Sequence, residues 1–140
     1  MSIEWFVGFA DGTSRHTCNL SSASWVIYST LGQLVSSSGS CLGPATNNVA
    51  EYREIIELLW DVSLRRISCL EVRLDSQLVV SQLNSHYQVW NPTLLRQFLH
   101  VRLLQINFEY ISFNHISRNE NTITDAYANY ILDWNLTHIL

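Results

Sequence analysis

The alternation of apolar and polar positions predicts that the first third of the chain forms an antiparallel meander of strands. Three segments are rich in β-branched and aromatic residues and are separated by turn signals: Ile3–Ala10, Ala23–Thr30 and Gln33–Cys41. We expect the first strand to end at the turn signal Asp11-Gly12, and Leu31-Gly32 to form the hairpin between the other two.

The rest of the chain alternates between helical and extended patterns. From Val49 to about Leu64, apolar residues recur at helical spacing, with charges between them at Arg53, Glu54, Glu57 and Asp61. Further helices are predicted at Ser76–Asn84, from Pro92 to Leu103 and from Asp125 to Leu136, and further strands at Cys69–Leu74 and Phe108–Ile116. The order β-β-β-α-β-α-α-β-α predicts a single α/β domain over residues 1–140. Its five-stranded mixed sheet has three antiparallel and two parallel strands flanked by helices.

Composition agrees with a packed domain but does not by itself point to a function. Apolar residues make up 47% of the 140 residues and charged residues 14%, which is typical of a folded protein rather than a disordered one. The net charge of −4 argues against an obvious nucleic-acid binder. All eight basic residues are arginine, however, and the planar guanidinium fork matches phosphate oxygens.

The cysteines Cys18, Cys41 and Cys69 are odd in number and lack the paired spacing of zinc sites, so they favour a reducing compartment. We find no secretory leader pattern and no apolar run long enough to span a membrane. The sequence therefore predicts an intracellular monomer, in the cytoplasm or nucleus, that does not insert into membranes.

Four carboxylates stand at the ends of predicted elements. Asp11 closes the first strand, Asp75 closes the fourth, Glu51 lies in the first turn of the long helix and Asp125 opens the last helix. Each alone is common as a turn former or helix cap. If the two strands are neighbours, Asp11 and Asp75 lie about 5 Å apart and repel each other unless a cation lies between them. The four together form an oxygen cage that suits Mg²⁺ or Mn²⁺ rather than zinc.

Four stretches of the chain resemble, in order and spacing, the signature blocks of type 1 ribonuclease H; they are Phe9–Ser14, Thr46–Tyr52, Leu74–Val79 and Asn121–Asn129. The Thr-Asn-Asn-x-Ala-Glu-Tyr and Asp-Ser-Gln-Leu-Val-Val blocks are the most specific of them. The chain is most similar to the reverse-transcriptase-like RNase H domains of plants and retroelements and to short archaeal and bacterial enzymes. The resemblance covers essentially the whole chain and implies the RNase H-like fold.

The resemblance implies endonucleolytic hydrolysis of the RNA strand of RNA–DNA hybrids, leaving 5′-phosphate and 3′-hydroxyl ends. It also implies that Asp11, Glu51, Asp75 and Asp125 bind two Mg²⁺ ions, for which Mn²⁺ can substitute. In the usual two-metal arrangement one ion activates a water and the other stabilises the leaving 3′-oxygen.

The same resemblance implies a set of substrate-binding residues: Gly12, Thr13, Asn47, Asn48, Gln77 and Arg118. The two asparagines and Gln77 match positions that contact the minor groove, where 2′-hydroxyls distinguish RNA from DNA. Gly12 and Thr13 would allow close approach of the backbone to the RNA strand, and Arg118 would contact a phosphate. The alternatives left open are that the asparagines only cap the helix and that Gln77 is an exposed residue without a role.

The chain departs from the family pattern in ways that affect substrate binding. The segment Leu83–Leu95 lacks lysine and arginine, whereas some family members carry a basic substrate-binding segment there. Residues 15–20 stand where the family usually has a glycine-rich stretch. No histidine lies in the loop before Asp125, which carries Arg118, and Thr124 replaces a small residue there. We therefore expect weak affinity for the hybrid, which tethering to a reverse transcriptase would offset through effective concentration.

Other nuclease classes fit less well. A DEDD-type exonuclease needs an acid at Thr13, an integrase-like enzyme needs its Glu after the second Asp, and no phosphate-binding glycine loop is present. The alternative that remains is a catalytically silent RNase H-like module that binds nucleic acid or a protein partner. The pI near 5.6 and aromatic residues such as Trp90 and Trp134 would suit it.

Overall fold

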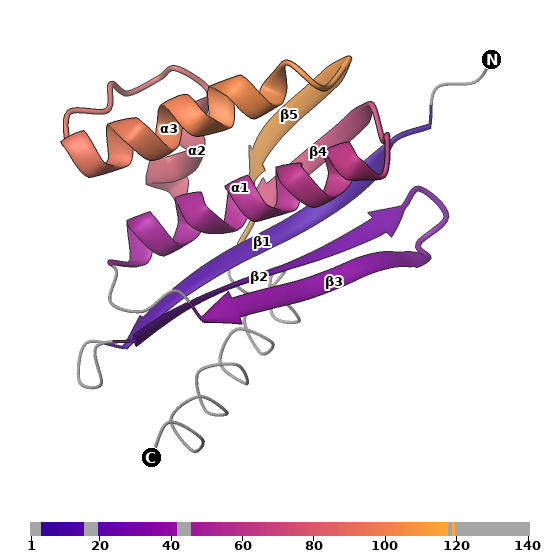
Figure 1. Ribbon diagram of the computed structural model, residues 1–140, viewed down its shortest axis with the longest axis horizontal. Coiled ribbons are helices and arrows are strands. Elements are labelled where there is room, and N and C mark those ends of the chain that lie inside the picture. Colours follow the sequence, from indigo (N-terminus) through magenta and orange to yellow (C-terminus); the bar gives the residue numbers. More distant parts are fainter. Residues whose placement is uncertain (1–3, 16–19, 42–45, 118, 120–140) are drawn as a thin grey trace.

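The computed structural model describes residues 4–15, 20–41, 46–117 and 119, with the backbone alone at 11–15, 20–23, 40 and 41. This part forms one mixed sheet with helices packed against it (Figure 1). The strands are β1 (Phe6–Arg15), β2 (Leu20–Ser29), β3 (Leu34–Cys41), β4 (Cys69–Leu74) and β5 (Tyr110–His115). The helices are α1 (Asn47–Leu64), α2 (Gln77–Leu83) and α3 (Pro92–Gln105).

The sheet has the predicted mixed topology. Its spatial order is β3-β2-β1-β4-β5. The β1–β2 and β2–β3 pairs are antiparallel, whereas β1–β4 and β4–β5 are parallel. Helical crossovers connect the parallel strands, as the element order requires. The last predicted helix, 125–136, lies outside the described residues.

The predicted end of the first strand at Asp11-Gly12 is wrong. β1 continues to Arg15, and its residues pair with β2 as far as Arg15↔Leu20, so β2 also begins earlier than Ala23. The long antiparallel ladder gives these residues backbone partners, and this outweighs the local turn preference of an Asp-Gly pair. The predicted hairpin at Leu31-Gly32 is confirmed, because Gly32 has φ +80° and its N–H donates to the Ser29 carbonyl at 2.9 Å.

Helix α1 packs closely on β1. A Cβ added at Gly8 would lie 2.9 Å from Leu58 Cδ1, so only glycine allows the helix this close to the strand. Leu58 is fully buried, and the core continues on both sides of it. The largest fully buried apolar side chains are Tyr52, Ile27, Ile55, Leu58, Leu59, Leu70 and Leu74.

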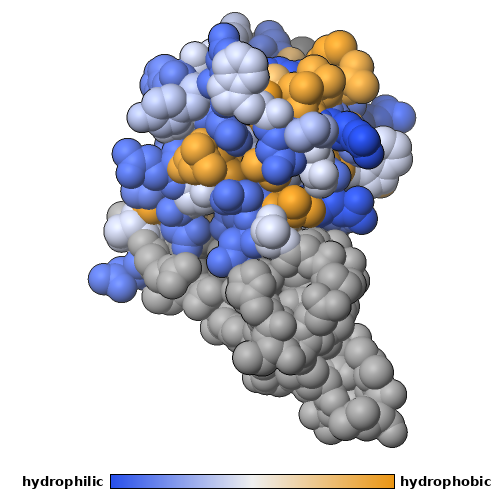
Figure 2. Space-filling view, turned by 90° about the vertical axis from the view of Figure 1, so that its left-hand side faces the viewer, coloured by the Kyte–Doolittle hydropathy of each residue, from blue (hydrophilic) through white to orange (hydrophobic). Residues whose placement is uncertain are grey.

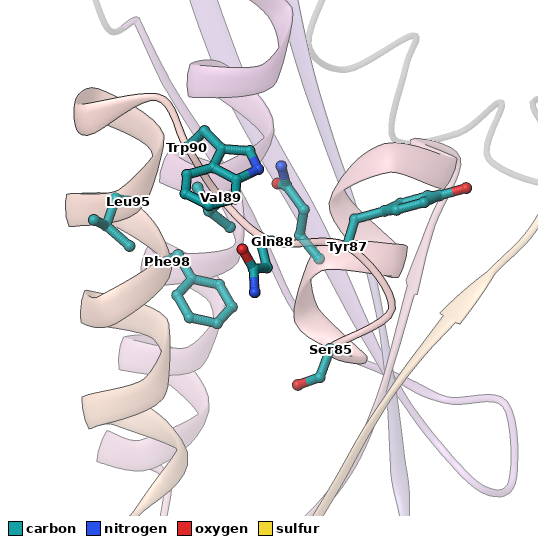
Figure 3. Close-up of a pocket in the computed structure, with 8 residues that line it drawn as sticks. Ser85, Tyr87, Gln88, Val89, Trp90, Leu95 and Phe98 are labelled. Atoms are coloured by element: carbon teal, nitrogen blue, oxygen red, sulfur yellow. The ribbon is translucent and has the colours of Figure 1, made fainter.

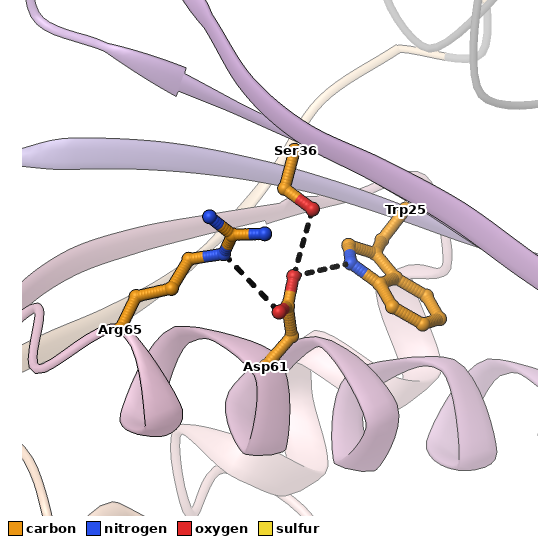
Figure 4. A network of polar contacts seen from close by, with 4 residues as sticks. All are labelled: Trp25, Ser36, Asp61 and Arg65. Atoms are coloured by element: carbon orange, nitrogen blue, oxygen red, sulfur yellow. Dashed lines mark hydrogen bonds and ion pairs between the residues drawn. The ribbon is translucent and has the colours of Figure 1, made fainter.

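A polar network fixes the C-terminal half of α1 to the sheet (Figure 4). Trp25 Nε1 on β2 donates to Asp61 Oδ2 at 3.3 Å, and Ser36 Oγ on β3 donates to the same oxygen at 2.9 Å. Arg65 Nε pairs with Asp61 Oδ1 at 3.2 Å. The protein therefore supplies donors to both oxygens of this carboxylate.

The second and third helices are fixed to α1 and to each other by further polar contacts. Tyr52 Oη on α1 donates to Gln82 Oε1 on α2 at 2.6 Å in a buried environment. Arg102 on α3 donates to the Leu83 carbonyl at 2.6 Å. Asn91 caps α3 before Pro92, as the position of the proline predicts. Among the described residues, no helix is both long enough and apolar enough to cross a membrane.

Candidate active site beside β1 and the end of β4

The parallel register of β1 and β4 brings the chain segments that carry two of the predicted acidic positions next to each other. The ladder runs from Phe6↔Leu70 to Ala10↔Leu74, so the next residues along the two strands are Asp11 and Asp75. Neighbouring strands lie about 4.8 Å apart, which sets the spacing of the two backbones at this edge. The adjacency of the two strands, on which the predicted proximity of these positions depends, is confirmed, although Asp11 lies within its strand and not at its end.

Glu51 reaches the same place from the helix layer. Leu58 lies over Gly8, and α1 runs antiparallel to β1 (Figure 1). Seven residues of helix from Leu58 back to Glu51 and three residues of strand from Gly8 on to Asp11 both cover about 10 Å. This geometry places Glu51 over the part of β1 that contains Asp11.

The start of α1 differs from the prediction. The helix begins at Asn47, and Thr46 Oγ1 accepts the Val49 N–H at 3.3 Å as the N-cap, so Glu51 is beyond the first turn. The asparagines are not the caps, because they already lie inside the helix. Asn47 is exposed and Asn48 is half-buried. Thr46 is the cap because it stands directly before the first helical residue, where its side-chain oxygen can accept one of the backbone N–H groups of the first turn.

The described carboxylates of this region are shielded from water. Glu51 is only 4% exposed, and Asp75 is half-buried between β4 and α2. One oxygen of each, Glu51 Oε2 and Asp75 Oδ2, is buried. Ser76, the next residue, accepts the Val79 N–H at 3.3 Å and so caps α2. The cap fixes the chain direction directly after Asp75.

Glu54 is a buried acid that the helical pattern failed to reveal. It is fully buried, although the sequence places it among the charged positions of the helix. It lies three residues after Glu51 and four before Leu58, and this spacing puts all three on one face of α1. The four-residue spacing between Glu54 and Leu58 was the signal that could have indicated burial of Glu54. The charge of the Glu54 side chain pointed instead to an exposed position.

The other predicted site residues divide into those that the structure places and those outside it. Gln77 opens α2 and is exposed. Gly12 and Thr13 are extended and pair with Ala23 and Ser22 of β2. Arg118, Asp125 and Trp134 lie outside the described residues.

The described side chains include no group of three His, Cys, Asp or Glu residues that could hold a metal ion. Of the four predicted ligands, they include only Glu51 and Asp75, because the side chain of Asp11 and all of Asp125 are not described. The ligands that are described have the right chemistry for Mg²⁺, since both are carboxylates with a buried oxygen.

An aromatic groove lies beside α2, in the segment where the sequence lacks arginine and lysine (Figure 3). It has a volume of about 440 Å³, and its walls come from the loop between α2 and α3 and from α3 itself. Trp90 is 83% exposed at its rim, and Leu95 and Phe98 form the α3 wall. Tyr87 points away from that wall (Figure 3). The described residues that line the groove offer apolar and amide surface, and none of them is cationic.

Comparison with known proteins assigns the family. The model of the reverse transcriptase-like family matches residues 9–131. Ribonuclease HI of Halobacterium salinarum is 36% identical over 125 residues, which cover 89% of this chain and 63% of that protein. A bifunctional protein of Mycobacterium tuberculosis is 33% identical over 89% of this chain and 34% of its own length. The chain thus spans less than two thirds of either curated relative.

Solved structures confirm the fold. Ribonuclease H1 of Halobacterium salinarum superimposes with a TM-score of 0.88 at 35% identity, covering 92% of this chain and 98% of that one. The N-terminal RNase H domain of the Mycobacterium tuberculosis protein gives 0.90 at 31%, covering 98% and 99%. LC11 ribonuclease H1, solved with an RNA/DNA hybrid, gives 0.87 at 30%, covering 94% and 99%. The chain belongs to the reverse transcriptase-like family of type 1 ribonuclease H domains.

Proposed function

We propose that this protein is a ribonuclease H that cleaves the RNA strand of RNA–DNA hybrids endonucleolytically, leaving 5′-phosphate and 3′-hydroxyl ends. The observation that supports the proposal is the β1–β4 register, which ends at the pair Ala10↔Leu74, so that Asp11 and Asp75 are the next residues along the two chain segments. Buried Glu51 lies over the part of β1 that contains Asp11. The names of the relatives, one of them solved with an RNA/DNA hybrid, support the same reaction.

The family is metal-dependent, and the proposed ligands of two Mg²⁺ ions, or of Mn²⁺ in their place, are Asp11, Glu51, Asp75 and Asp125. The donors fit, because carboxylate oxygens are what these hard cations prefer. Bound there, the ions would supply an activated water and stabilise charge on the leaving 3′-oxygen. The protein's own part is to hold the carboxylates on a strand pair and a helix that are packed rigidly together.

The substrate would lie across the helix starts on the same side of the sheet. Asn47 and Gln77 are exposed at the first residues of α1 and α2, and Asn48 is half-buried next to them. Their amides can both donate and accept hydrogen bonds, as recognition of 2′-hydroxyls in a minor groove requires. Gly12 and Thr13 are proposed to meet the RNA backbone, and Arg118 a phosphate.

The proposals for substrate affinity, partner proteins and cellular location rest mainly on the sequence. Weak affinity for the hybrid is expected because the groove beside α2 lacks cationic side chains. A reverse transcriptase joined to the chain would raise the local substrate concentration. The monomeric state and the intracellular location stay predictions.

The test is hydrolysis of a hybrid labelled on either strand, with Mg²⁺ or Mn²⁺. We expect cleavage of the RNA strand alone, and a loss of about 10³-fold in Asp75→Asn. Glu71→Gln is the matched control, because Glu71 lies on the same strand and pairs with Arg73 Nε at 2.8 Å. Equal activity in wild type and Asp75→Asn, or none in either, would contradict the proposal.

A catalytically silent binding module is the second candidate. The exposed Trp90 favours it, because an aromatic ring at the rim of a groove can bind bases or apolar side chains without any catalysis. Hybrid binding that Trp90→Ala weakens, in a protein that shows no hydrolysis with either metal, would favour this candidate over the enzyme.

A further inference from the structure

Helix α3 carries apolar residues on two opposite faces. The inward face packs on the core through Val101 and Leu104, with Leu94 and Phe98 partly buried against it. The outward face carries Leu95, Leu99 and Leu103, which recur at every fourth residue and are exposed. The fold accounts for the inward set only, because one apolar face is enough to attach a helix to a core.

The outward apolar face continues onto the end of α1. Asn107 Nδ2, just after α3, donates to Ser63 Oγ on α1 at 3.5 Å, so the two helix ends meet. A groove of about 490 Å³ lies there, with Trp60 and Leu64 among its walls. The resulting outer patch consists of Trp60 (55% exposed), Leu64 (68%), Leu99 (52%), Leu103 (68%) and Ile106 (78%).

An apolar surface of this kind is unusual on an isolated domain. Single exposed leucines are common, but a set of five large apolar side chains over two neighbouring helices is typical of an interaction site. On the side of the molecule drawn in Figure 2, apolar side chains also gather near the top, at the level of α3 in Figure 1.

The polar residues around the outer patch are mainly basic. Helix α3 contains no acid, and Arg96 and His100 are exposed beside its outward leucines. Arg66 is exposed just after α1. The acids nearby in sequence are half-buried Glu57 and exposed Glu109, while Asp61 is paired with Arg65. Among the exposed side chains around the outer patch, Arg66, Arg96 and His100 therefore outnumber Glu109, on a chain whose net charge is −4.

We propose that the outer patch docks an acidic amphipathic helix of a partner protein. Leucines at helical spacing accept the apolar face of such a helix, and Arg96 and Arg66 complement its carboxylates. A second copy of this chain fits less well, since a symmetric contact would bring two copies of the same Arg- and His-bearing surface together. Nucleic acid also fits less well, because it is held by aromatic stacking and cations rather than by aliphatic side chains.

The position of the outer patch leaves the candidate active site free. Leu64 and Glu51 lie 13 residues apart on one helix, which corresponds to about 20 Å. A partner bound at the outer patch can therefore hold the domain while a hybrid occupies the other end of α1. Such tethering would offset weak substrate affinity through effective concentration.

The experiment measures fluorescence anisotropy of a labelled synthetic helix of about 18 residues with the whole chain. The probe has leucines at positions i, i+3, i+4 and i+7 and glutamates on its other faces; a second peptide replaces each glutamate with lysine. We expect saturable binding of the acidic peptide that weakens with salt, and binding of the lysine peptide that is at least about tenfold weaker.

Variants locate the binding. Leu99→Gln combined with Leu103→Gln should weaken the acidic peptide at least about tenfold, because both side chains would contact it. Leu31→Gln is the control, since Leu31 is 84% exposed on the β2–β3 hairpin and does not belong to the outer patch. Circular dichroism verifies that each variant is folded. We expect all of them to fold, because the substituted side chains are exposed.

Four results would overturn the proposal. They are the absence of saturable binding, equal binding of both peptides, an equal effect of Leu31→Gln, and unchanged binding in the double variant. If the double variant instead abolishes a dimer seen by sedimentation, the occupant is a second copy. If it weakens binding of an RNA–DNA hybrid but not of the peptide, the outer patch is a nucleic-acid surface.

Discussion

The two ends of α1 each carry a carboxylate that is removed from bulk water, yet their surroundings differ. Near the C-terminal end, Asp61 accepts hydrogen bonds from Trp25 and Ser36 and pairs with Arg65. Near the N-terminal end, buried Glu51 lies over the part of β1 that contains Asp11, and Asp75 follows the neighbouring strand β4. Asp61 therefore lies among donors of the sheet and the helix, whereas Glu51 lies near chain positions that carry further acids.

This difference distinguishes a structural carboxylate from a candidate metal ligand. Donors around Asp61 balance its charge and tie α1 to β2 and β3, so its contribution is to stability. Carboxylates that converge need a cation to balance them, which is the condition of a metal site. Sequence position alone does not separate the two, because both acids lie at regular positions of one amphipathic helix.

Glu51→Gln should have the largest effect. We expect hybrid hydrolysis to fall about 10³-fold, equivalent to about 4 kcal/mol, because an amide is a much weaker ligand for Mg²⁺ than a carboxylate. Thermal unfolding should change little, since the side chain keeps its size. Activity within a few-fold of wild type would place Glu51 with Asp61 as a structural acid.

Asp61→Ala tests the other end of the helix. Removing the acceptor leaves Trp25 Nε1 and Ser36 Oγ without this partner, and we expect the free energy of unfolding to fall by about 2–3 kcal/mol. Urea denaturation measures the change. Hydrolysis at a temperature where the variant is folded should stay within about twofold, given the distance along α1; a loss comparable to that of Glu51→Gln would remove the distinction between the two ends.

Gly8→Ala tests the contact between α1 and β1, midway between the two ends. The added methyl would come within 2.9 Å of Leu58 Cδ1, so we expect a loss of about 1–3 kcal/mol in a core where Leu58 is fully buried. Combining it with Leu58→Val should recover part of the stability in the same denaturation assay. An undestabilised single variant would show that the helix can move away without loss.

Tyr52→Phe should have the smallest effect at neutral pH. It removes the hydrogen bond to Gln82, and we expect about 1 kcal/mol of destabilisation. Burial raises the pKa of the Tyr52 phenol in the folded protein, with Arg102 opposing the shift. The folded state then holds its proton more tightly, so stability is present below about pH 10 and is lost as pH rises above it.

Denaturation at pH 8 and about pH 11 measures that dependence. Wild type should lose more stability than Tyr52→Phe between the two values, because only wild type has this phenol to ionise. Parallel losses in both proteins would show that other groups dominate at high pH.

Much of the architecture could be predicted from periodicity. The end of α1 at Leu64 and strand β4 at Cys69–Leu74 agree with the pattern, because their apolar residues recur at spacings that only one element satisfies. The end of β1 could not be predicted in this way. Asp11-Gly12 is locally a turn signal, and only pairing with β2, an interaction between distant residues, extends the strand to Arg15.

The candidate site was predictable in its residue types but not in its surroundings. Acids next to apolar strands indicated Asp75, and the signature block indicated Glu51. Burial of Glu54 was not predictable, because a glutamate at helical spacing is more often exposed and its depth depends on what packs over that face.

By itself, the sequence determined the order of the described strands and helices, the mixed sheet and the position of Asp75 directly after β4. Local propensity and periodicity are properties of neighbouring residues, so they can be read along the chain. Tertiary structure decided that Ala10 pairs with Leu74, which sets Asp11 beside Asp75. It also decided that Asp61 meets Trp25 and Ser36. Register and burial arise from contacts between segments far apart in sequence, and those contacts exist only once the chain has folded.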